Sequence, residues 1–209
     1  QGNWKTPFKP LHTVNEGYIE GNAWNYSLFI PQDVDGYINL LGGNKVFTSR
    51  LDSLFTIEIS EEEFKESEDI DKVGIIGNYI HGNEPSHHVA YMYNWAGAPW
   101  KTQEKIHLIV DSKYHTGPDG LCGNDDCGQM SAWYVFSAMG FYPVTPGSPI
   151  YAIGSPVFEK TTVKLANGKQ MVIKANDVSR KNVYIQSAQL NGNDYTKTYI
   201  SHADLMNGG

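Results

Sequence analysis

Residues 128–143, GQMSAWYVFSAMGFYP, are the stretch of this sequence that best indicates its fold class. The run 128–139 predicts a helix, and Gly140 and Pro143 end it, because glycine and proline are common just beyond a helix C-terminus. A long glycine-rich turn, residues 116–123, precedes this helix. The chain is therefore expected to turn sharply on both sides of it, as helices in stacked hairpins do.

The N-terminal two-thirds of the chain repeat this arrangement. Asn44 and Thr102 are predicted to cap two of the helices. Val46, Leu51, Leu54 and Phe55 are expected to share one side of the first of these. Short Gly or Pro turns separate the predicted helical segments, which is typical of an α-barrel or α-solenoid. These segments are residues 22–30, 34–41, 45–55, 87–95 and 103–110.

From Tyr151 onward the apolar period changes to two, which is typical of strands. Residues 161–165 and 171–174 flank an Asn167-Gly168 turn, and this pattern predicts a β-hairpin. A second turn signal, Asn191-Gly192, follows two shorter predicted strands. These shorter strands are expected at residues 183–186 and 188–190.

The fold class that these patterns predict is mainly α with an appended antiparallel β element. The boundary is expected near Pro149, so that residues 1–149 form the helical part and residues 150–209 the small C-terminal β element. The chain has 209 residues, of which 40% are hydrophobic and 19% charged, and this composition indicates a globular protein.

Composition also excludes two broad classes of function. A net charge of −7 without a long basic run argues against nucleic-acid binding. No apolar run approaches the roughly 18 residues of a membrane span, so no span is expected. The polar first ten residues show no signal peptide. The chain begins without Met, so it is expected to be a mature form or an excised fragment. Aromatic residues make up 12%, which suits stacking on ring-shaped ligands as well as core packing.

Asp125 and Asp126 lie in a glycine-rich segment, residues 120–128, just ahead of the predicted helix. Glycine lets a ligand approach closely, and the positive end of the helix dipole favours an ionised carboxylate. The pair therefore suits a general base or a cation ligand, although Asp is also a preferred helix cap. Cys122 and Cys127 in the same segment are compatible with a tight disulfide, half of a metal site or two thiols.

Residues 81–88, HGNEPSHH, form a second polar cluster. Asn83 and Glu84 offer the oxygen ligands that Ca²⁺ prefers, while the imidazoles suit a transition metal or a polar substrate. His87 and His88 are adjacent and point about 100° apart on a helix, so they cannot easily share one metal. The alternative interpretation is a capped helix start with histidines that pack in the core or lie at the surface.

Glu20 is the third candidate, because it precedes Gly21 and an aromatic-rich segment. Neighbouring Trp and Tyr side chains would desolvate its carboxyl group, raise its pKa and suit a general acid. An exposed glutamate at a helix start is the plainer interpretation, and Asp33 and Asp35 are expected to be turn or cap residues. Carboxylates on two sides of an aromatic cleft are typical of glycoside hydrolysis.

Four ordered segments of the sequence resemble glycoside hydrolase family 92, the exo-acting α-mannosidases. They are residues 20–26 (EGNAWNY), 81–88 (HGNEPSHH), 123–134 (GNDDCGQMSAWY) and 139–147 (MGFYPVTPG). The resemblance runs from about Gly17 to Gly209. It implies a Ca²⁺-dependent inverting enzyme, secreted or periplasmic, that releases mannose from mannan or N-glycans.

The resemblance also implies an architecture, in which an N-terminal β-sandwich precedes a catalytic (α/α)₆ barrel. This chain then corresponds to the later barrel helices and the closing β element. The β-sandwich and the early barrel helices are missing from it, so the chain is expected to be a C-terminal fragment with little activity of its own.

Site residues follow from the matching motifs. Glu20 corresponds to the general acid, and the general base comes from Asp125 or Asp126. Asn83 and Glu84 are expected in the Ca²⁺ neighbourhood. Three further residues are expected on the substrate side: His81, His87 and Trp95.

One departure from the family pattern concerns linkage. Members that cleave α-1,2 links tend to carry a His-Glu pair before the Asn-Glu-Pro stretch, whereas this chain has His81-Gly82. The departure leaves α-1,3, α-1,4, α-1,6 and phosphodiester-linked mannose open. The alternative to an enzyme is a non-catalytic carbohydrate-binding or interaction module, and a third interpretation makes the carboxylates helix caps and any calcium structural.

Overall fold

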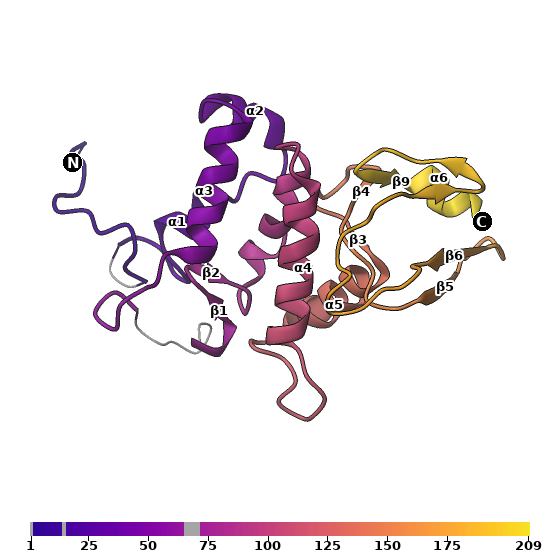
Figure 1. The fold of residues 1–209 in the computed structure, drawn as a ribbon. Helices are drawn as coiled ribbons and strands as arrows, with labels where there is room; N and C mark the ends of the chain where they lie inside the picture. The colour runs from indigo at the N-terminus through magenta and orange to yellow at the C-terminus, as the bar shows by residue number, and fades with distance from the viewer. Residues whose placement is uncertain (1, 14–15, 65–71) are drawn as a thin grey trace.

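The computed structural model of the chain describes residues 2–13, 16–64 and 72–209. Helix α4 lies between α3 on one side and the C-terminal strands on the other (Figure 1). The helices are α1 (Ala23–Tyr26), α2 (Val34–Leu40), α3 (Asn44–Thr56), α4 (Pro99–Lys113), α5 (Gln129–Met139) and α6 (His202–Asn207), with 3₁₀ turns η1 (Lys72–Gly74), η2 (Glu84–Ser86), η3 (Val89–Asn94) and η4 (Asp126–Gly128).

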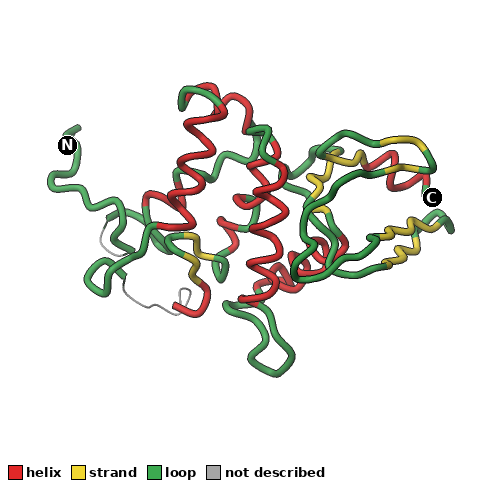
Figure 2. The backbone as a smooth tube through the Cα atoms, in the orientation of Figure 1, coloured by secondary structure: helices red, strands yellow, loops and turns green. Residues whose placement is uncertain are grey.

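The strands form small antiparallel sheets, which Figure 2 shows in yellow at the C-terminal end and in one short hairpin near the helices. One sheet has the order β3-β4-β9, and the other strands pair as hairpins. They are β1 (Ile75–Ile76), β2 (Tyr79–Ile80), β3 (Phe141–Tyr142), β4 (Ile150–Ile153), β5 (Lys160–Lys164), β6 (Gln170–Lys174), β7 (Gln189–Leu190), β8 (Asn193–Asp194) and β9 (Tyr199–Ser201).

Helix α3 shows how apolar spacing sets the buried face. Phe47, Leu51, Leu54 and Phe55 are all buried, and their spacing of four, three and one residues follows one helix stripe. The prediction that Val46 belongs to this stripe is wrong, since its side chain is 51% exposed. Phe47 takes that position, because neighbouring residues point about 100° apart around a helix.

Two predicted caps are also wrong. Asn44 is the first helical residue of α3, Gly43 precedes it with a φ of +97°, and no side-chain cap bond forms there. Thr102 is a buried residue inside α4 rather than its cap. Helix α4 begins earlier than predicted, at Pro99, because proline has a helical φ and needs no hydrogen-bond acceptor in the first turn.

Two segments predicted as longer helices are shorter or more tightly wound. The segment 22–30 is helical only over α1, and the segment 87–95 contains the 3₁₀ turn η3. Every residue of η3 is buried, so packing against α3 and α4 rather than local helix propensity fixes its conformation. The predictions for 34–41 and 128–139 agree with α2 and α5 to within one residue.

The β region confirms the hairpin predicted around Asn167-Gly168, in which Lys160 pairs with Lys174. The strand predicted at 183–186 does not form, because Ile185 donates its main-chain N–H to the Gln103 side chain at 3.0 Å. Helices plus small antiparallel sheets match the predicted fold class at this level. Strand β3 pairs with β4, so one sheet begins before the predicted boundary near Pro149.

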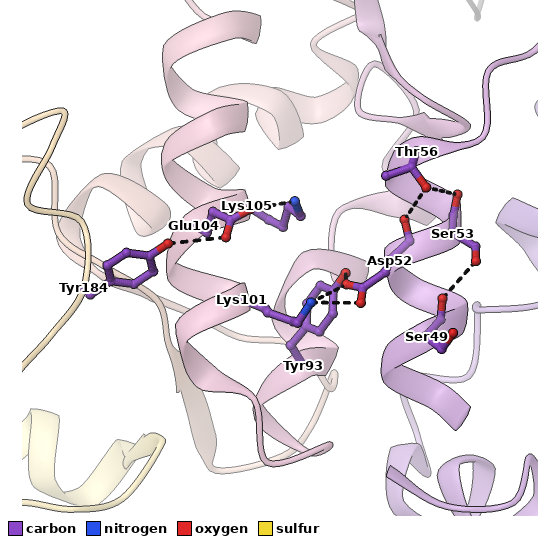
Figure 3. A network of polar contacts seen from close by, with 9 residues as sticks. All are labelled: Ser49, Asp52, Ser53, Thr56, Tyr93, Lys101, Glu104, Lys105 and Tyr184. Carbon is purple, nitrogen blue, oxygen red and sulfur yellow. Dashed lines mark hydrogen bonds and ion pairs between the residues drawn. The ribbon is translucent and has the colours of Figure 1, made fainter. Parts of the chain in front are cut away.

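A polar network ties three elements together (Figure 3). Asp52 on α3 accepts two hydrogen bonds of 2.8 Å from Lys101 on α4 and one of 3.0 Å from the Tyr93 hydroxyl on η3. Glu104 on α4 accepts a bond of 3.4 Å from the Tyr184 hydroxyl in the β region. These partly exposed contacts fix the alignment of the elements more than they add stability, because exposed ion pairs contribute about 0–1 kcal/mol.

Candidate active site

Glu20 lies directly before a helix start whose main chain is held by side chains. Gly21 has a φ of +75°, a conformation that glycine adopts easily. Asn22 then caps α1, and its side chain accepts hydrogen bonds from the N–H groups of Trp24 at 3.0 Å and Asn25 at 3.4 Å. The half-buried Glu20 therefore belongs to a fixed turn at the start of α1.

The structure joins the first two motifs through one side-chain contact. The Nδ2 group of Asn83 donates a hydrogen bond of 2.5 Å to Oε2 of Glu20. Asn83 is buried, and it precedes η2, which packs against α1. The predicted general acid and a predicted member of the calcium neighbourhood therefore touch, although they lie 63 positions apart in the sequence.

Three glycines bring the third motif to the same place. A Cβ atom on Gly82 would lie 2.5 Å from the carbonyl oxygen of Cys122, and one on Gly74 would lie 2.9 Å from it. A Cβ atom on Gly123 would overlap the carbonyl group of Gly82. The main-chain segments therefore contact each other directly at Gly74, Gly82 and Gly123, which we call the glycine seam. The segment that carries Asp125 begins at this seam.

The two aspartates have different surroundings. Asp125 accepts hydrogen bonds from the N–H group of Ser131 at 3.0 Å and from its hydroxyl at 2.6 Å. These bonds from Ser131 lower the pKa of Asp125, and they make it a capping residue for α5. Asp126 is exposed, and no described residue donates a hydrogen bond to its carboxylate.

The backbone after Asp126 is unusual. Cys127 has a φ of +52° and Gly128 a φ of +78°, so the chain reverses just before α5 begins. A residue other than glycine in this region is strained, and such strain is common at functional sites. Cys122 is buried and Cys127 exposed, and no disulfide joins them.

His81 and His87 lie in the core rather than on an accessible surface. The ring nitrogens of His81 are hydrogen-bonded to the hydroxyl groups of Tyr79 at 2.8 Å and Tyr114 at 2.7 Å. His87 donates from Nε2 to the His81 carbonyl at 3.0 Å, and its Nδ1 accepts from Gln129 at 3.2 Å. Burial lowers the pKa of His87 to about 4 and that of His81 well below its usual value. Both rings are therefore neutral near pH 7 and buried in the described part of the chain, and their contact with substrate stays a prediction.

The third substrate-side candidate, Trp95, and the neighbouring His88 are also packed. His88 is buried and donates from Nε2 to the Leu28 carbonyl at 2.8 Å. Trp95 is half-buried against the main apolar core. The structure therefore supports the interpretation of the HGNEPSHH segment as packed histidines beside two oxygen-bearing residues, the buried Asn83 and the half-buried Glu84.

Sequence reasoning gave no role to two residues beside the site. Tyr26 lies close to Glu20, and burial raises the pKa of its hydroxyl, although a hydrogen bond with the Glu20 main chain opposes that rise. Gln129 donates from Nε2 to His87 and, at 3.0 Å, to the hydroxyl of Tyr142. Both lie inside motif segments, so the motif marked their importance, but their partners are distant in sequence.

Donor chemistry near Asn83 fits calcium in kind. Because Asn83 points its Nδ2 group at Glu20, its Oδ1 atom is turned away from that bond, and Glu84 adds a carboxylate. Across residues 2–13, 16–64 and 72–209, no group of three or more His, Cys, Asp or Glu side chains could hold a metal. Ca²⁺ takes about six to eight oxygen ligands, so Asn83 and Glu84 would supply only part of such a set.

No helix in the described part of the chain is long and apolar enough to cross a membrane. A pair of Asp or Glu side chains that flank the scissile bond is typical of glycoside hydrolases. The family described as "Glycosyl hydrolase family 92 catalytic domain" matches residues 1–209, and the chain belongs to this family. This membership confirms the resemblance found in the sequence.

Named relatives agree with the family. The chain is 48% identical to the family GH92 α-mannosidase BT3965 from Bacteroides thetaiotaomicron, with a TM-score of 0.88 over 99% of this chain and 27% of that one. It is 38% identical to the inverting mannosidase BT2199 of the same organism, with a TM-score of 0.83 over 100% of this chain and 29% of that one. It is also 36% identical, over 97% of its length, to an uncharacterized secreted glycosidase of Arthroderma benhamiae, of which it covers 24%. The chain therefore spans about a quarter of the length of these relatives.

Proposed function

We propose that the full-length protein containing this chain is a secreted, inverting exo-α-mannosidase that acts on mannan or N-glycans. The observation that carries the proposal is the meeting of three motif segments, through the Glu20–Asn83 hydrogen bond and the glycine seam. Two family members of similar structure are named mannosidases, and BT3965 has been solved in complex with mannoimidazole. The relative from Arthroderma benhamiae, which is named as secreted, supports the location.

We assign the general acid to Glu20. As the bond between C1 of mannose and the glycosidic oxygen breaks, Glu20 gives its proton to that oxygen, and the leaving sugar departs as an alcohol. A carboxylate on the opposite face of the ring takes a proton from water, whose oxygen attacks C1 and inverts its configuration. Such an acid and base lie roughly 6.5–9.5 Å apart to leave room for the water.

We assign the general base to Asp126 rather than Asp125. The carboxylate oxygens of Asp125 are both engaged by Ser131, so Asp125 holds the start of α5. Asp126 is exposed and follows directly, at a point where the chain reverses. It is therefore the member of the pair that can accept a proton from water.

We propose that Ca²⁺ binds beside Glu20, with Asn83 Oδ1 and the Glu84 carboxylate among its oxygen ligands. Water, substrate hydroxyl groups and parts of the full-length protein would complete the set. When bound, the cation polarises and orients sugar hydroxyl groups. Asn83 has a second task, because its Nδ2 group holds one oxygen of Glu20.

The helices of this chain are proposed to form the later part of an (α/α)₆ barrel, with a β-sandwich and the early helices supplied elsewhere in the full-length protein. Coverage of 27–29% of the solved relatives supports this proposal. A cleft missing most of its helices cannot exclude water or hold a sugar, so the isolated chain is expected to have little activity.

A panel of α-linked mannobioses, incubated with the full-length protein in Ca²⁺ and then in EDTA, tests the proposed function. Release of mannose that stops in EDTA is expected, and the panel identifies the linkage. Binding of mannosides without release in either condition would favour the carbohydrate-binding module. Release that EDTA does not affect would contradict the proposed role of calcium but not the mannosidase activity.

A further inference from the structure

Behind Glu20 lies a cluster of three buried amides, Asn22, Asn25 and Asn78, none of them more than 5% exposed. Asn22 donates from Nδ2 to the Asn78 side chain at 2.8 Å and to the Leu11 carbonyl at 3.0 Å. Asn25 donates from Nδ2 to the Asn78 carbonyl at 2.6 Å. The amide cluster therefore joins the first turn of α1 to a segment more than 50 residues away.

Asn78 is itself firmly placed. It lies in the two-residue turn between β1 and β2, and its N–H group donates to the Leu54 carbonyl of α3 at 2.8 Å. Gly77 precedes it with a φ of +63°, and a Cβ atom there would lie 2.5 Å from the main chain of Phe55. The turn is thus docked on the C-terminal end of α3, and it offers a rigid support for α1.

The same segment reaches Glu20 from a second side. After the turn, β2 leads within five residues from Asn78 to Asn83, whose Nδ2 group holds Oε2 of Glu20. Asn78 fixes the main chain that follows Glu20, and Asn83 fixes its carboxylate. Gly21 completes the arrangement, since a Cβ atom there would lie 2.8 Å from Oδ1 of Asn25.

From this geometry we infer that Asn78 is a positioning residue for Glu20, acting through its side chain on Asn22 and through its main-chain carbonyl on Asn25. The inference rests on the proposed function, in which Glu20 donates the proton. Asn78 contacts neither Glu20 nor a sugar directly. It sets where the carboxyl group lies, and a displacement of about 1 Å at such a group can reduce turnover about 100-fold.

The test compares two substrates in the full-length protein. Cleavage of an α-linked mannobiose requires the general acid to protonate the leaving sugar. In α-mannosyl fluoride the leaving group is fluoride, a stable anion that needs little help from an acid. Glu20→Gln provides the reference pattern, with mannobiose cleavage lost and fluoride hydrolysis largely kept. Asn78→Ala is expected to give the same split, with kcat/KM on mannobiose lowered about 10- to 100-fold.

Two isosteric variants guard against an effect of misfolding. Asn78→Asp keeps the oxygen that accepts from Asn22 and is expected to recover much of the lost mannobiose turnover. Asn25→Asp keeps the oxygen that accepts from the Asn22 N–H group but loses the donor to Asn78, so it should reproduce the split. The matched control is Asn94→Ala, which removes two part-buried side-chain hydrogen bonds, to the carbonyl groups of Ile153 and Thr198. It should change both substrates in equal proportion.

A uniform loss on both substrates in Asn78→Ala and Asn25→Asp would overturn the inference, as would full mannobiose turnover in either variant. If Glu20→Gln itself fails to separate the two substrates, the assignment of the acid is wrong, and the inference is overturned with it. A clear split in Glu20→Gln without one in the amide variants refutes the positioning role alone.

Discussion

Glu20 and Asp126 differ in how firmly the surrounding residues hold them. Glu20 is half-buried, held by Asn83 and backed by a capped turn, whereas Asp126 is exposed and directly precedes the two residues with positive φ, Cys127 and Gly128. A donor that must protonate one oxygen benefits from a fixed position, and a base that meets water benefits from access to solvent. The residue pattern therefore agrees with an acid and a base rather than with two equivalent ligands.

The first prediction separates the two aspartates. Asp126→Asn in the full-length protein should lower kcat at least about 100-fold, as expected for loss of a general base, without changing the unfolding temperature. Asp125→Ala should leave more activity but lower the unfolding temperature, because it removes the acceptor of both hydrogen bonds from Ser131. Kinetics and thermal unfolding of both variants check this. The reverse pattern would show that Asp125 is the base.

A second prediction concerns linkage and Gly82. Because a Cβ atom at Gly82 would lie 2.5 Å from the Cys122 carbonyl, Gly82→Glu cannot simply restore a His-Glu pair. We expect Gly82→Glu and Gly82→Ala to lower the unfolding temperature and turnover on every linkage alike. A mannobiose panel measured on both variants checks this. A specific gain of α-1,2 cleavage by Gly82→Glu would show that the glycine seam can accommodate a side chain at this position.

At the scale of elements, α5 is anchored by one aromatic residue. Trp133 is fully buried, stacks on Tyr114 with ring centroids 5.8 Å apart, and donates from Nε1 to the His87 carbonyl at 2.9 Å. It therefore connects the helix after the Asp pair to the segment after Asn83. Because both segments carry site residues, the packing of α5 also sets the geometry of the site.

The third prediction follows from this anchor. Trp133→Phe removes the hydrogen bond and leaves the His87 carbonyl with one donor fewer, so it should destabilise the protein by about 1–3 kcal/mol. Denaturant unfolding measures the change. The matched control is Trp100→Phe, at a 52% exposed position, which should change stability little. Equal effects at the two positions would contradict the anchoring role.

Local sequence patterns predicted the long helices and the longest hairpin. They failed for segments whose conformation depends on tertiary contacts. Apolar stripes located α2, α3 and α5, and an Asn-Gly turn located the β5–β6 hairpin. The buried η3 has the composition of an α-helix. It is so short that the spacing of its apolar residues cannot distinguish an α-helix from a 3₁₀-helix. Likewise, the motifs marked Glu20 and Asn83, but no sequence pattern joins two residues 63 positions apart.

Over the whole molecule, buried imidazoles couple stability to pH. Burial lowers the pKa of His88, so the unfolded chain binds its proton first as pH falls. The neutral ring therefore contributes stability that is present above about pH 6.5. That stability is lost as the pH falls from there toward the lowered pKa of the folded state.

The fourth prediction is a difference in this pH dependence. His88→Gln keeps an amide that can donate to the Leu28 carbonyl but has no proton to bind. Unfolding temperatures measured between pH 7 and pH 5 should fall less for His88→Gln than for the unsubstituted protein. Parallel curves would show that His88 does not contribute to the loss in acid. The carboxylates with lowered pKa values, such as Asp125, contribute equally to both proteins.

The central claim is that Glu20 and Asp126 face one bound sugar from opposite sides. A crystal structure of the full-length protein with Ca²⁺ and mannoimidazole, the ligand seen in a complex of BT3965, tests it most directly. The account predicts the two carboxyl groups roughly 6.5–9.5 Å apart, with Glu20 beside the position of the glycosidic oxygen and a water between Asp126 and C1. A ligand bound away from Glu20, or carboxyl groups too far apart to share it, would contradict the account.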